Sequence, residues 1–445
     1  MNKNAQGTNG RSLSRRDALR LSGVGALGVM GAGFLAACGD SEATNSGTEP
    51  TASSSSGGKP SGKPILVGGS LALTGFLSPS ALIHKTAGEL FVDRLNAKGG
   101  LLGRPVEWRV LDDQSQNDKA AAAYERLITE NEVDLITGPY GTGAFSAAIR
   151  VAQRYGYVIP NHTGSLTYQY SYENHFPSWS SGRYPNISVV SDVLDMLEET
   201  GKPPKKIMFV VNEFPGSNYL AFGTGDGDSK DKTGAVQVAK DRGYDVSQIT
   251  YPSNISDWAP IAAQIRGTDP DLIWNGGVGL DAANLAQALK AINYKPKGQF
   301  SLWSSPGPLD GLGETSDNVM LAGLYLPSMP SAQSPEVKSI IEEYSARAKA
   351  SQTYPVFETQ AASEWVAWEF LVQAVEGTES LDNKVLGEWL RKNGVESQLL
   401  GKLSFNSDEN NYTGNESIIG QLQDGVWQSV WPAKKSSAKV VYPSV

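Results

Sequence analysis

The chain has 445 residues, a formal net charge of −9 and a single cysteine. An acidic chain without a dense basic patch is a poor partner for nucleic acid or for anionic lipid, because both are negatively charged. The lone cysteine excludes a disulfide within the chain. The roughly 380 residues that follow Lys63 exceed what one hydrophobic core usually holds, so the length predicts two domains.

Residues 1–37 have the features of an export signal. The pair Arg15-Arg16 precedes an apolar run rich in Gly and Ala, and small residues stand at its end. A basic region, a short apolar region and small residues before a cleavage point are typical of such signals, and paired arginines indicate the twin-arginine route. We therefore do not interpret this run as a membrane-spanning domain.

Cys38 follows Leu35-Ala36-Ala37, and these four residues resemble a bacterial lipobox, whose cysteine becomes the lipidated amino terminus. The alternative is a chance cysteine after an ordinary signal, but the only cysteine of the chain falls at this position. A diacylglycerol on Cys38 would supply the two acyl chains that stable anchoring requires. Residues 39–63 contain almost nothing apolar, so residues 38–63 are predicted to be a lipidated cysteine and a flexible tether.

From Pro64 the sequence alternates predicted strands and helices. The strands expected in the first half lie at residues 65–69, 106–111, 133–137 and 157–160. Those expected in the second half lie at residues 206–211, near 246, 271–275 and 299–303. An irregular segment at 166–185 separates the halves and is interpreted as a crossing between domains. The alternation predicts an α/β fold in which both halves repeat one architecture, a parallel sheet covered by helices on both faces.

The stretch 133–165 contains two units of one kind, each an apolar strand that runs into a loop of glycine and hydroxyl residues. GPYGTG at 138–143 places Thr142 at the start of a helix, and NHTGS at 161–165 contributes Thr163 and Ser165. Loops at the carboxyl ends of neighbouring parallel strands line one crevice, and the amino end of a helix attracts an anion. The three hydroxyls are therefore expected to hold a small carboxylate. The alternative for Thr142 is that it only caps its helix.

Five short motifs occur in a characteristic order along the chain. They are LTG at 73–75, RLNAKGGLLG at 94–103, DD at 112–113, GPY at 138–140 and RYG at 154–156. Together they resemble the periplasmic branched-chain amino acid binding family, the type I substrate-binding proteins of ABC importers. The resemblance extends from about Lys63 to the carboxyl terminus.

This resemblance implies two doubly wound α/β lobes joined by three crossings, with a hinge and an inter-lobe cleft that closes around the ligand. Lobe 1 would contain residues 64–183 and about 325–398. Lobe 2 would contain residues 184–324 and about 399–445.

The expected ligand-binding residues follow strand ends or lie at a crossing between the lobes. They are Phe76, Thr142, Thr163, Ser165, Arg183, Phe214, Asp281 and Trp303. The resemblance assigns the carboxylate-holding hydroxyl to Thr142 and further contacts to Thr163 and Ser165. It places an aromatic wall near Phe214, and a polar end near Asp281 or the loop that starts at Trp303.

The chain departs from the family pattern where amino-acid binders place acids against the ammonium group. Ser304 stands at one such position, and our alignment puts Arg183 at the other. A buried ammonium needs a partner, which Asp281 or Glu358 could supply. Alternatively, the ligand is a carboxylate without an amine and Arg183 is a second anion contact, or Arg183 is a solvated hinge residue.

The sequence contains no Gly-x-Ser-x-Gly elbow, no His-Glu-x-x-His and no phosphate-binding loop, so we do not expect an enzyme. The three histidines, His84, His162 and His175, lack the spacing of metal ligands along the chain, and neither a metal nor a cofactor is expected. Trp179, Trp274 and Trp303 are expected near the cleft, where they could stack on a ligand.

The sequence thus predicts an exported, monomeric binding protein that is lipid-anchored to the outer face of the cytoplasmic membrane. It would capture a small carboxylate ligand, expected to be an amino acid of the branched-chain type, and deliver it to an ABC permease. Two alternatives stay open: a binder of an amine-free organic acid or amide, and a ligand sensor for a membrane receptor. An extracellular hydrolase would need an acid–base pair or nucleophile that the sequence does not show.

Overall fold

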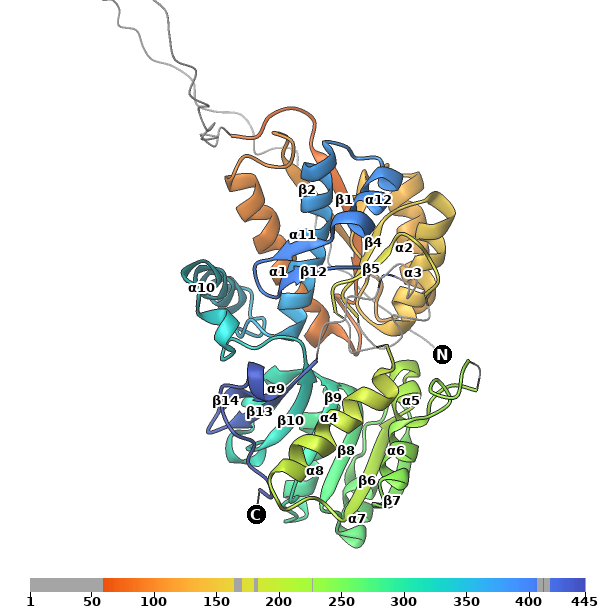
Figure 1. The fold of residues 1–445 in the computed structure, drawn as a ribbon, viewed down its shortest axis with the longest axis vertical. Coiled ribbons are helices and arrows are strands. Elements are labelled where there is room, and N and C mark those ends of the chain that lie inside the picture. The colour runs from red at the N-terminus through yellow and green to blue at the C-terminus, as the bar shows by residue number, and fades with distance from the viewer. Residues whose placement is uncertain are drawn as a thin grey trace, which may run out of the picture. The chain divides into compact units, whose positions relative to one another are not determined.

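The computed structural model describes residues 59–163, 170–179, 183–225, 227–405, 411 and 417–444. Within these ranges the chain forms two α/β lobes, each built on its own sheet of mainly parallel strands, which confirms the predicted fold class (Figure 1). None of the helices in the described ranges has both the length and the apolar character needed to cross a membrane.

The first lobe is built on a parallel sheet in the order β2-β1-β3. Its strands are β1 (Ile65–Leu71), β2 (Val106–Asp112) and β3 (Leu135–Ile136). A separate parallel pair is formed by β4 (Ile159–Asn161) and β5 (His175–Pro177). The helices are α1 (Ser78–Ala97), α2 (Asn117–Thr129), α3 (Thr142–Tyr155), α10 (Pro335–Ala350), α11 (Thr359–Thr378) and α12 (Asn383–Asn393).

Alternate side chains of a strand point to opposite faces of the sheet, and β1 shows what this does to the packing. Ile65 and Val67 belong to a buried cluster that includes residues of α1 and α11. Leu66 packs instead against the cluster formed by α2 and α3. The strand is therefore apolar on both faces, as expected for a parallel sheet covered on both sides.

The second lobe has a seven-stranded sheet in the order β14-β13-β10-β9-β8-β6-β7. The strands are β6 (Lys206–Asn212), β7 (Asp245–Tyr251), β8 (Leu272–Gly279), β9 (Gln299–Ser304), β10 (Val319–Gly323), β13 (Ile418–Gln423) and β14 (Val426–Trp431). The first five pair in parallel, and the last two add an antiparallel edge. The helices are α4 (Pro185–Glu199), α5 (Pro215–Phe222), α6 (Ala235–Asp241), α7 (Ala259–Thr268), α8 (Asp281–Ala291) and α9 (Pro306–Asp310).

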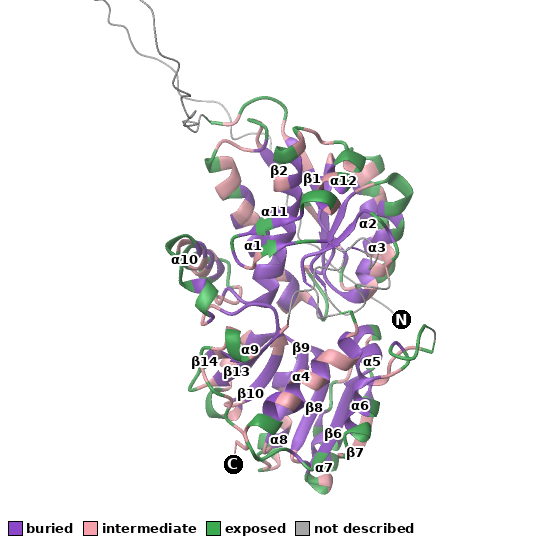
Figure 2. Cartoon of the chain, viewed as in Figure 1, coloured by how far each residue is buried: buried purple, intermediate pink, exposed green. Residues whose placement is uncertain are grey.

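Alternation along β6 again divides the core into two layers. Phe209 packs on the face that α4 covers, whereas Met208 and Val210 pack on the face that α7 and α8 cover. The strands of this sheet are mostly buried, as Figure 2 shows. Trp274, which we expected near the cleft, lies inside the α4 layer with its ring centroid 5.2 Å from that of Phe209. It is a core residue because its position on β8 directs it into that layer.

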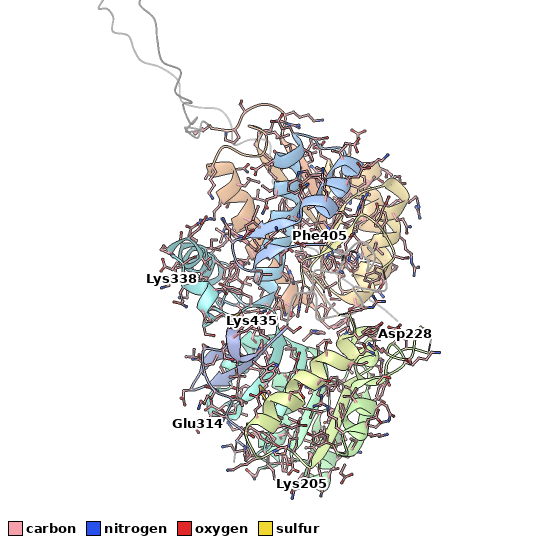
Figure 3. All side chains as sticks on the ribbon, in the orientation of Figure 1. Lys205, Asp228, Glu314, Lys338, Phe405 and Lys435 are labelled. Atoms are coloured by element: carbon pink, nitrogen blue, oxygen red, sulfur yellow. The ribbon has the colours of Figure 1, made fainter. Side chains whose placement is uncertain are left out.

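The late segments return to the first lobe before the chain ends in the second. α10 and α11 pack against α1, and β11 (Val395–Ser397) pairs with β12 (Gly401–Leu403). Phe405, labelled in Figure 3, packs edge-on against Phe176 and Phe370 in the core of the first lobe. The chain thus stays with that core to at least Phe405, beyond residue 398 where the resemblance placed the last crossing. The complete domain division remains a prediction.

Candidate ligand-binding site

A pocket lies where the carboxyl ends of strands from both lobes meet. Its first-lobe lining follows β1, β3, β4 and β5 and consists of Leu77, Tyr140, Gly141, Thr142, Thr163 and Trp179. Its second-lobe lining follows β6 or ends β8 and β9, and includes Phe214, Ser217, Leu220, Val278, Leu302 and Trp303. The space between these side chains measures about 420 Å³ when its open mouth is included.

The amino end of α3 opens onto this pocket without a side-chain cap. Gly141 occupies the cap position at φ 99°, a conformation that glycine adopts readily, and Thr142 is the first helical residue. Thr142 is buried, and no described residue hydrogen-bonds its hydroxyl. The helix-capping alternative is therefore wrong for Thr142. The helix amino end and its hydroxyl can instead receive an anion.

Thr163 reaches the same pocket from the loop after β4. Its backbone N–H donates to Asn161 Oδ1 at 2.9 Å, which fixes the turn, and its side chain is largely buried. The loop after β3 comes very close, since a Cβ on Gly138 would lie 2.4 Å from the carbonyl oxygen of Pro160. Only glycine permits this approach. Ser165, the third expected hydroxyl, lies outside the described residues.

Two aromatic pairs lie at the pocket. One of them, Phe76–Phe214, joins the lobes, whereas Trp179 and Trp303 belong to the same buried cluster of the second lobe. Trp179 and Trp303 meet edge to face with centroids 5.4 Å apart, and Phe76 meets Phe214 at 6.4 Å. Both indole N–H groups are buried and lack a partner among the described residues. Phe76 is 43% exposed and packs on Phe214 without lining the pocket. Close contact between the lobes is completed by Ser80 Oγ and Ser305 Oγ, 2.6 Å apart.

Asp281 is engaged inside the second lobe and does not line the pocket. Its Oδ2 accepts hydrogen bonds from Asn212 Nδ2 at 2.7 Å, Tyr251 Oη at 2.9 Å and the Val278 backbone N–H at 2.9 Å. Burial raises the pKa of this carboxyl, and the hydrogen bonds oppose that rise. Through these three hydrogen bonds Asp281 joins the ends of β6, β7 and β8.

Arg183 is exposed and does not line the pocket either. Its Nε donates to the hydroxyl of Tyr184 at 3.1 Å, and its guanidinium lies over the Tyr184 ring. The Tyr184 hydroxyl in turn donates to Asp228 Oδ2 at 2.9 Å. Arg183 is thus linked through the Tyr184 hydroxyl to Asp228, which lies in the loop between α5 and α6. Ser304, at the other departure from the family pattern, accepts from the Ala282 backbone N–H through its Oγ.

Glu358 caps the amino end of α11, where its Oε2 accepts from the Gln360 backbone N–H at 3.2 Å. It lines a small neighbouring hollow that also borders Trp303 and Ser304. Burial raises the pKa of Glu358 to about 8, so the carboxyl is mostly uncharged at neutral pH. The described lining of the ligand pocket accordingly contains hydrogen-bond donors but no acid.

Behind Tyr140 and Thr163 the fold assembles a group that the sequence did not reveal. His84 of α1, His162 of the loop after β4 and Glu364 of α11 place nitrogen and carboxylate atoms within 4.8 Å of one another. Burial lowers the pKa of His162 to about 4 and raises that of Glu364 to about 8. Spacing along the chain could not indicate this group, because its members come from three distant elements.

A larger hollow, about 1080 Å³ with its open mouth, lies elsewhere on the second lobe. It borders Gln299 and Val319, the first residues of β9 and β10, and therefore lies at the amino ends of these strands. Ligands of open parallel sheets bind at the carboxyl ends instead. The pocket at Thr142 is accordingly our candidate for the ligand site.

Several lining residues escaped the sequence interpretation, among them Tyr140, Ser217 and Val278. Each lies at, or within one helical turn of, a strand end or the loop that follows it. Loops at the carboxyl ends of parallel strands line one crevice, and this principle, which pointed to Thr142, also points to these residues when every strand of both halves is considered.

Two lobes of parallel α/β structure with a pocket at the strand ends define a type I periplasmic binding protein. The family model described as "Periplasmic binding protein" matches residues 64–425, so the chain belongs to this family. Its members bind small-molecule ligands on the outer side of the cytoplasmic membrane and work with ABC transporter permeases. The resemblance stated from the sequence motifs is thereby confirmed.

Individual relatives share this length and fold. A Leu/Ile/Val-binding protein homolog 8 of Brucella abortus is 23% identical, covering 84% of this chain and 90% of that protein. The Streptococcus pneumoniae protein LivJ, solved with isoleucine, has a TM-score of 0.65 at 20% identity over 86% of this chain and 100% of its own. A Rhodopseudomonas palustris solute-binding protein, solved with 3,4-dihydroxybenzoic acid, has a TM-score of 0.66 at 17% identity over 86% and 99%. At these identities the solved structures show the fold.

We predict that Glu358 makes folding stability fall as pH rises. The raised pKa means that the folded chain keeps a proton that the unfolded chain loses above its usual pKa of 4.5, so stability is lost between about pH 4.5 and 8. For one such group the free energy of unfolding changes by at most about 1.4 kcal/mol per pH unit.

Urea unfolding at pH 5 to 8 measures this dependence of the free energy of unfolding on pH. Glu358→Gln should flatten the decline, whereas the exposed Glu388→Gln should leave it unchanged. Equal slopes in both variants would contradict the assignment.

Proposed function

We propose that this chain captures a small apolar carboxylate outside the cytoplasm and delivers it to an ABC importer. The observation that carries the proposal is the uncapped amino end of α3, with the buried Thr142 hydroxyl at its first residue and Thr163 opposite. Backbone N–H groups and hydroxyls at such a helix end favour a carboxylate. Phe214, Leu220 and Leu302 would surround the apolar body of the ligand.

The donors and acceptors of the pocket favour a ligand without an amine. No acid lines the described pocket, Asp281 is held by three donors, and Glu358 is mostly uncharged at neutral pH. An ammonium group buried without a partner is strongly unfavourable. The buried indole N–H groups of Trp179 and Trp303 add donors, which suit an acid or a hydroxyl on the ligand. Aromatic and branched aliphatic monocarboxylates fit this chemistry, as the neighbour solved with 3,4-dihydroxybenzoic acid illustrates.

A branched-chain amino acid is the second candidate. Leu/Ile/Val-binding relatives match most of the chain, and a protein of the same fold was solved with isoleucine. This ligand would require an acceptor for its ammonium group. The described lining offers hydroxyl oxygens as acceptors but no carboxylate to balance the positive charge, so we rank the amino acid below the amine-free acid.

Closure of the lobes on the ligand would complete the site. The pairs Phe76–Phe214 and Ser80–Ser305 each join one residue of the first lobe to one of the second. A ligand that touches both lobes stabilises the arrangement in which these pairs form. Affinity is therefore linked to closure.

Matched ligands test the ammonium argument directly. The soluble chain from Gly39 is titrated calorimetrically with leucine, with 4-methylpentanoate, which is leucine without its amine, and with benzoate. We expect an amine-free acid to bind at least tenfold more tightly than leucine, because no described acid receives the ammonium. 3-Methylbutan-1-amine, which keeps the amine and lacks the carboxylate, should not bind.

Thermal shift gives an independent reading of the same titrations, since ligand at 100 times its dissociation constant adds about 2.7 kcal/mol of stability. Tighter binding of leucine than of 4-methylpentanoate would reject the amine-free assignment while leaving carboxylate capture intact. Failure of every carboxylate tested to bind would contradict the proposed function itself.

Thr142→Val removes the proposed carboxylate contact at nearly constant volume. A hydrogen bond to a charged group contributes about 1.5–3 kcal/mol, so the dissociation constant for the best acid should rise roughly 10- to 100-fold. Calorimetric titration measures the change. Thr129→Val, an exposed change on α2, is the matched control and should bind as the parent does. Unchanged affinity in a folded Thr142→Val protein would place the carboxylate elsewhere.

We further propose that Cys38 is lipidated and anchors the protein, because the only cysteine follows Leu35-Ala36-Ala37 at the end of the signal. Expressed with its signal in a bacterial host, the chain should partition into the detergent phase and carry the mass of a diacylglyceryl group. Cys38→Ser should abolish both properties, and replacement of Arg15-Arg16 by lysines tests the export route separately. A mature parent protein in the aqueous phase with an unmodified cysteine would disprove the anchor.

A further inference from the structure

Three fully buried polar side chains converge inside the first lobe. His84, His162 and Glu364 are each 0% exposed. His84 Nδ1 lies 3.4 Å from Glu364 Oε2, and His162 Nε2 lies 3.2 Å from the same oxygen. The two imidazole rings are neighbours, with centroids 4.2 Å apart, and the ring of Tyr140 lies 4.8 Å from that of His84.

The hydrogen-bond partners of this group are incomplete. Both nitrogens of His84, Nδ1 of His162 and Oε2 of Glu364 have none among the described residues. Buried polar side chains in folded proteins nearly always have partners, because losing water without replacement is unfavourable. The pairs at 3.2 and 3.4 Å lie near the limit for a hydrogen bond, and both involve Glu364 Oε2. A positively charged occupant close to that oxygen would satisfy the carboxylate and both rings together.

We propose that His84, His162 and Glu364 form a binding site for a divalent transition-metal ion of the zinc class. Zinc binds histidine nitrogen and carboxylate oxygen at about 2.1 Å, and two ligands of a tetrahedral ion then lie about 3.4 Å apart. Two of the three separations, 3.4 and 3.2 Å, match this value, and the two histidine nitrogens lie within 4.8 Å of each other. Two imidazoles and one carboxylate also favour zinc over calcium or magnesium, which prefer oxygen ligands alone.

The surroundings hold the ligands in place. Trp368 Nε1 donates to Glu364 Oε1 at 2.9 Å, and this orients the carboxylate with Oε2 toward the histidines. Gly138 contributes a carbonyl oxygen 2.7 Å from His162 Nε2. Without metal, Nε2 donates its proton to that carbonyl. Binding through Nε2 would release this proton to solvent and would require the Gly138 carbonyl to move aside, because an ion about 2.1 Å from Nε2 would otherwise overlap the carbonyl oxygen.

The site would stabilise the loops that line the ligand pocket. His162 directly precedes Thr163, and its partner Gly138 begins the loop that carries Tyr140 and Thr142. Bound metal would link these two loops to α1 and α11, which cover the face of the sheet behind them. This role differs from ligand capture, and metal binding is measurable without any carboxylate.

Metal analysis of the soluble chain from Gly39, made without a polyhistidine tag, tests the proposal. After incubation with equimolar zinc and gel filtration, we expect one zinc per chain by mass spectrometry and a higher midpoint of thermal unfolding. Cobalt in place of zinc should give the visible absorption bands of a tetrahedral ion. A chelator should reverse both effects.

Three variants assign the site. Glu364→Gln and His84→Gln should each lower zinc affinity at least 100-fold in a competition assay with a chromophoric chelator. His175→Gln is the matched control, since His175 is also buried but bonds Asn161 outside the group, and it should bind zinc as the parent does. Far-UV circular dichroism checks that each variant folds. If a variant does not fold, the zinc stoichiometry and the cobalt spectrum of the parent protein test the proposal without it.

The proposal is overturned if the parent retains less than a tenth of an equivalent of zinc. It is equally overturned if a folded Glu364→Gln chain binds zinc as tightly as the parent. The three side chains would then share protons in a closed, uncharged group. Neither outcome bears on carboxylate capture, which the matched-ligand titration measures separately.

Discussion

The carboxyl ends of parallel strands lie at the same edge of a sheet, and the site of this protein depends on that constraint. In the first lobe it places the uncapped amino end of α3 beside the loop after β4, so Thr142 and Thr163 line one pocket. In the second lobe it brings Phe214, Val278 and Trp303 to the facing edge. A helix end that no side chain caps is favourable only with an anion or water, and this supports our proposal that a carboxylate binds at Thr142.

The absence of an acid from the described lining then distinguishes between carboxylates with and without an amine, and it favours those without. Acids do occur nearby, but the fold uses them for other purposes: Asp281 joins three strand ends and Glu358 caps α11. Neither lines the described pocket, whereas the indole N–H groups of Trp179 and Trp303 remain available as donors. A pocket with donors and apolar walls suits an anion with an apolar body. If the lobes close on the ligand as proposed, inter-lobe contacts such as Phe76–Phe214 would make its binding dependent on closure.

Strong local patterns made much of the fold predictable. Apolar runs between glycine-rich loops gave β1, β2, β6 and β9 almost to the residue, and the same pattern identified Thr142 and Thr163. β5 was missed because its three residues lie in a segment without periodicity. The surroundings of Asp281 and Trp274 depend on which face of an element turns inward, and that follows from tertiary packing. Arg183 lies in the bend before α4, where no periodicity indicates the direction of a side chain. The group of His84, His162 and Glu364 could not be predicted, since only the packing of α1 and α11 brings its members together.

A crystal structure of the soluble chain with the carboxylate that binds most tightly tests the central claim most directly. The account predicts that the carboxylate lies at the first turn of α3 within hydrogen-bond distance of the Thr142 and Thr163 hydroxyls, and that the apolar body lies between Phe214 and Trp303. A ligand bound in the hollow beside Gln299, or one that directs its carboxylate to Arg183 away from α3, would contradict the account.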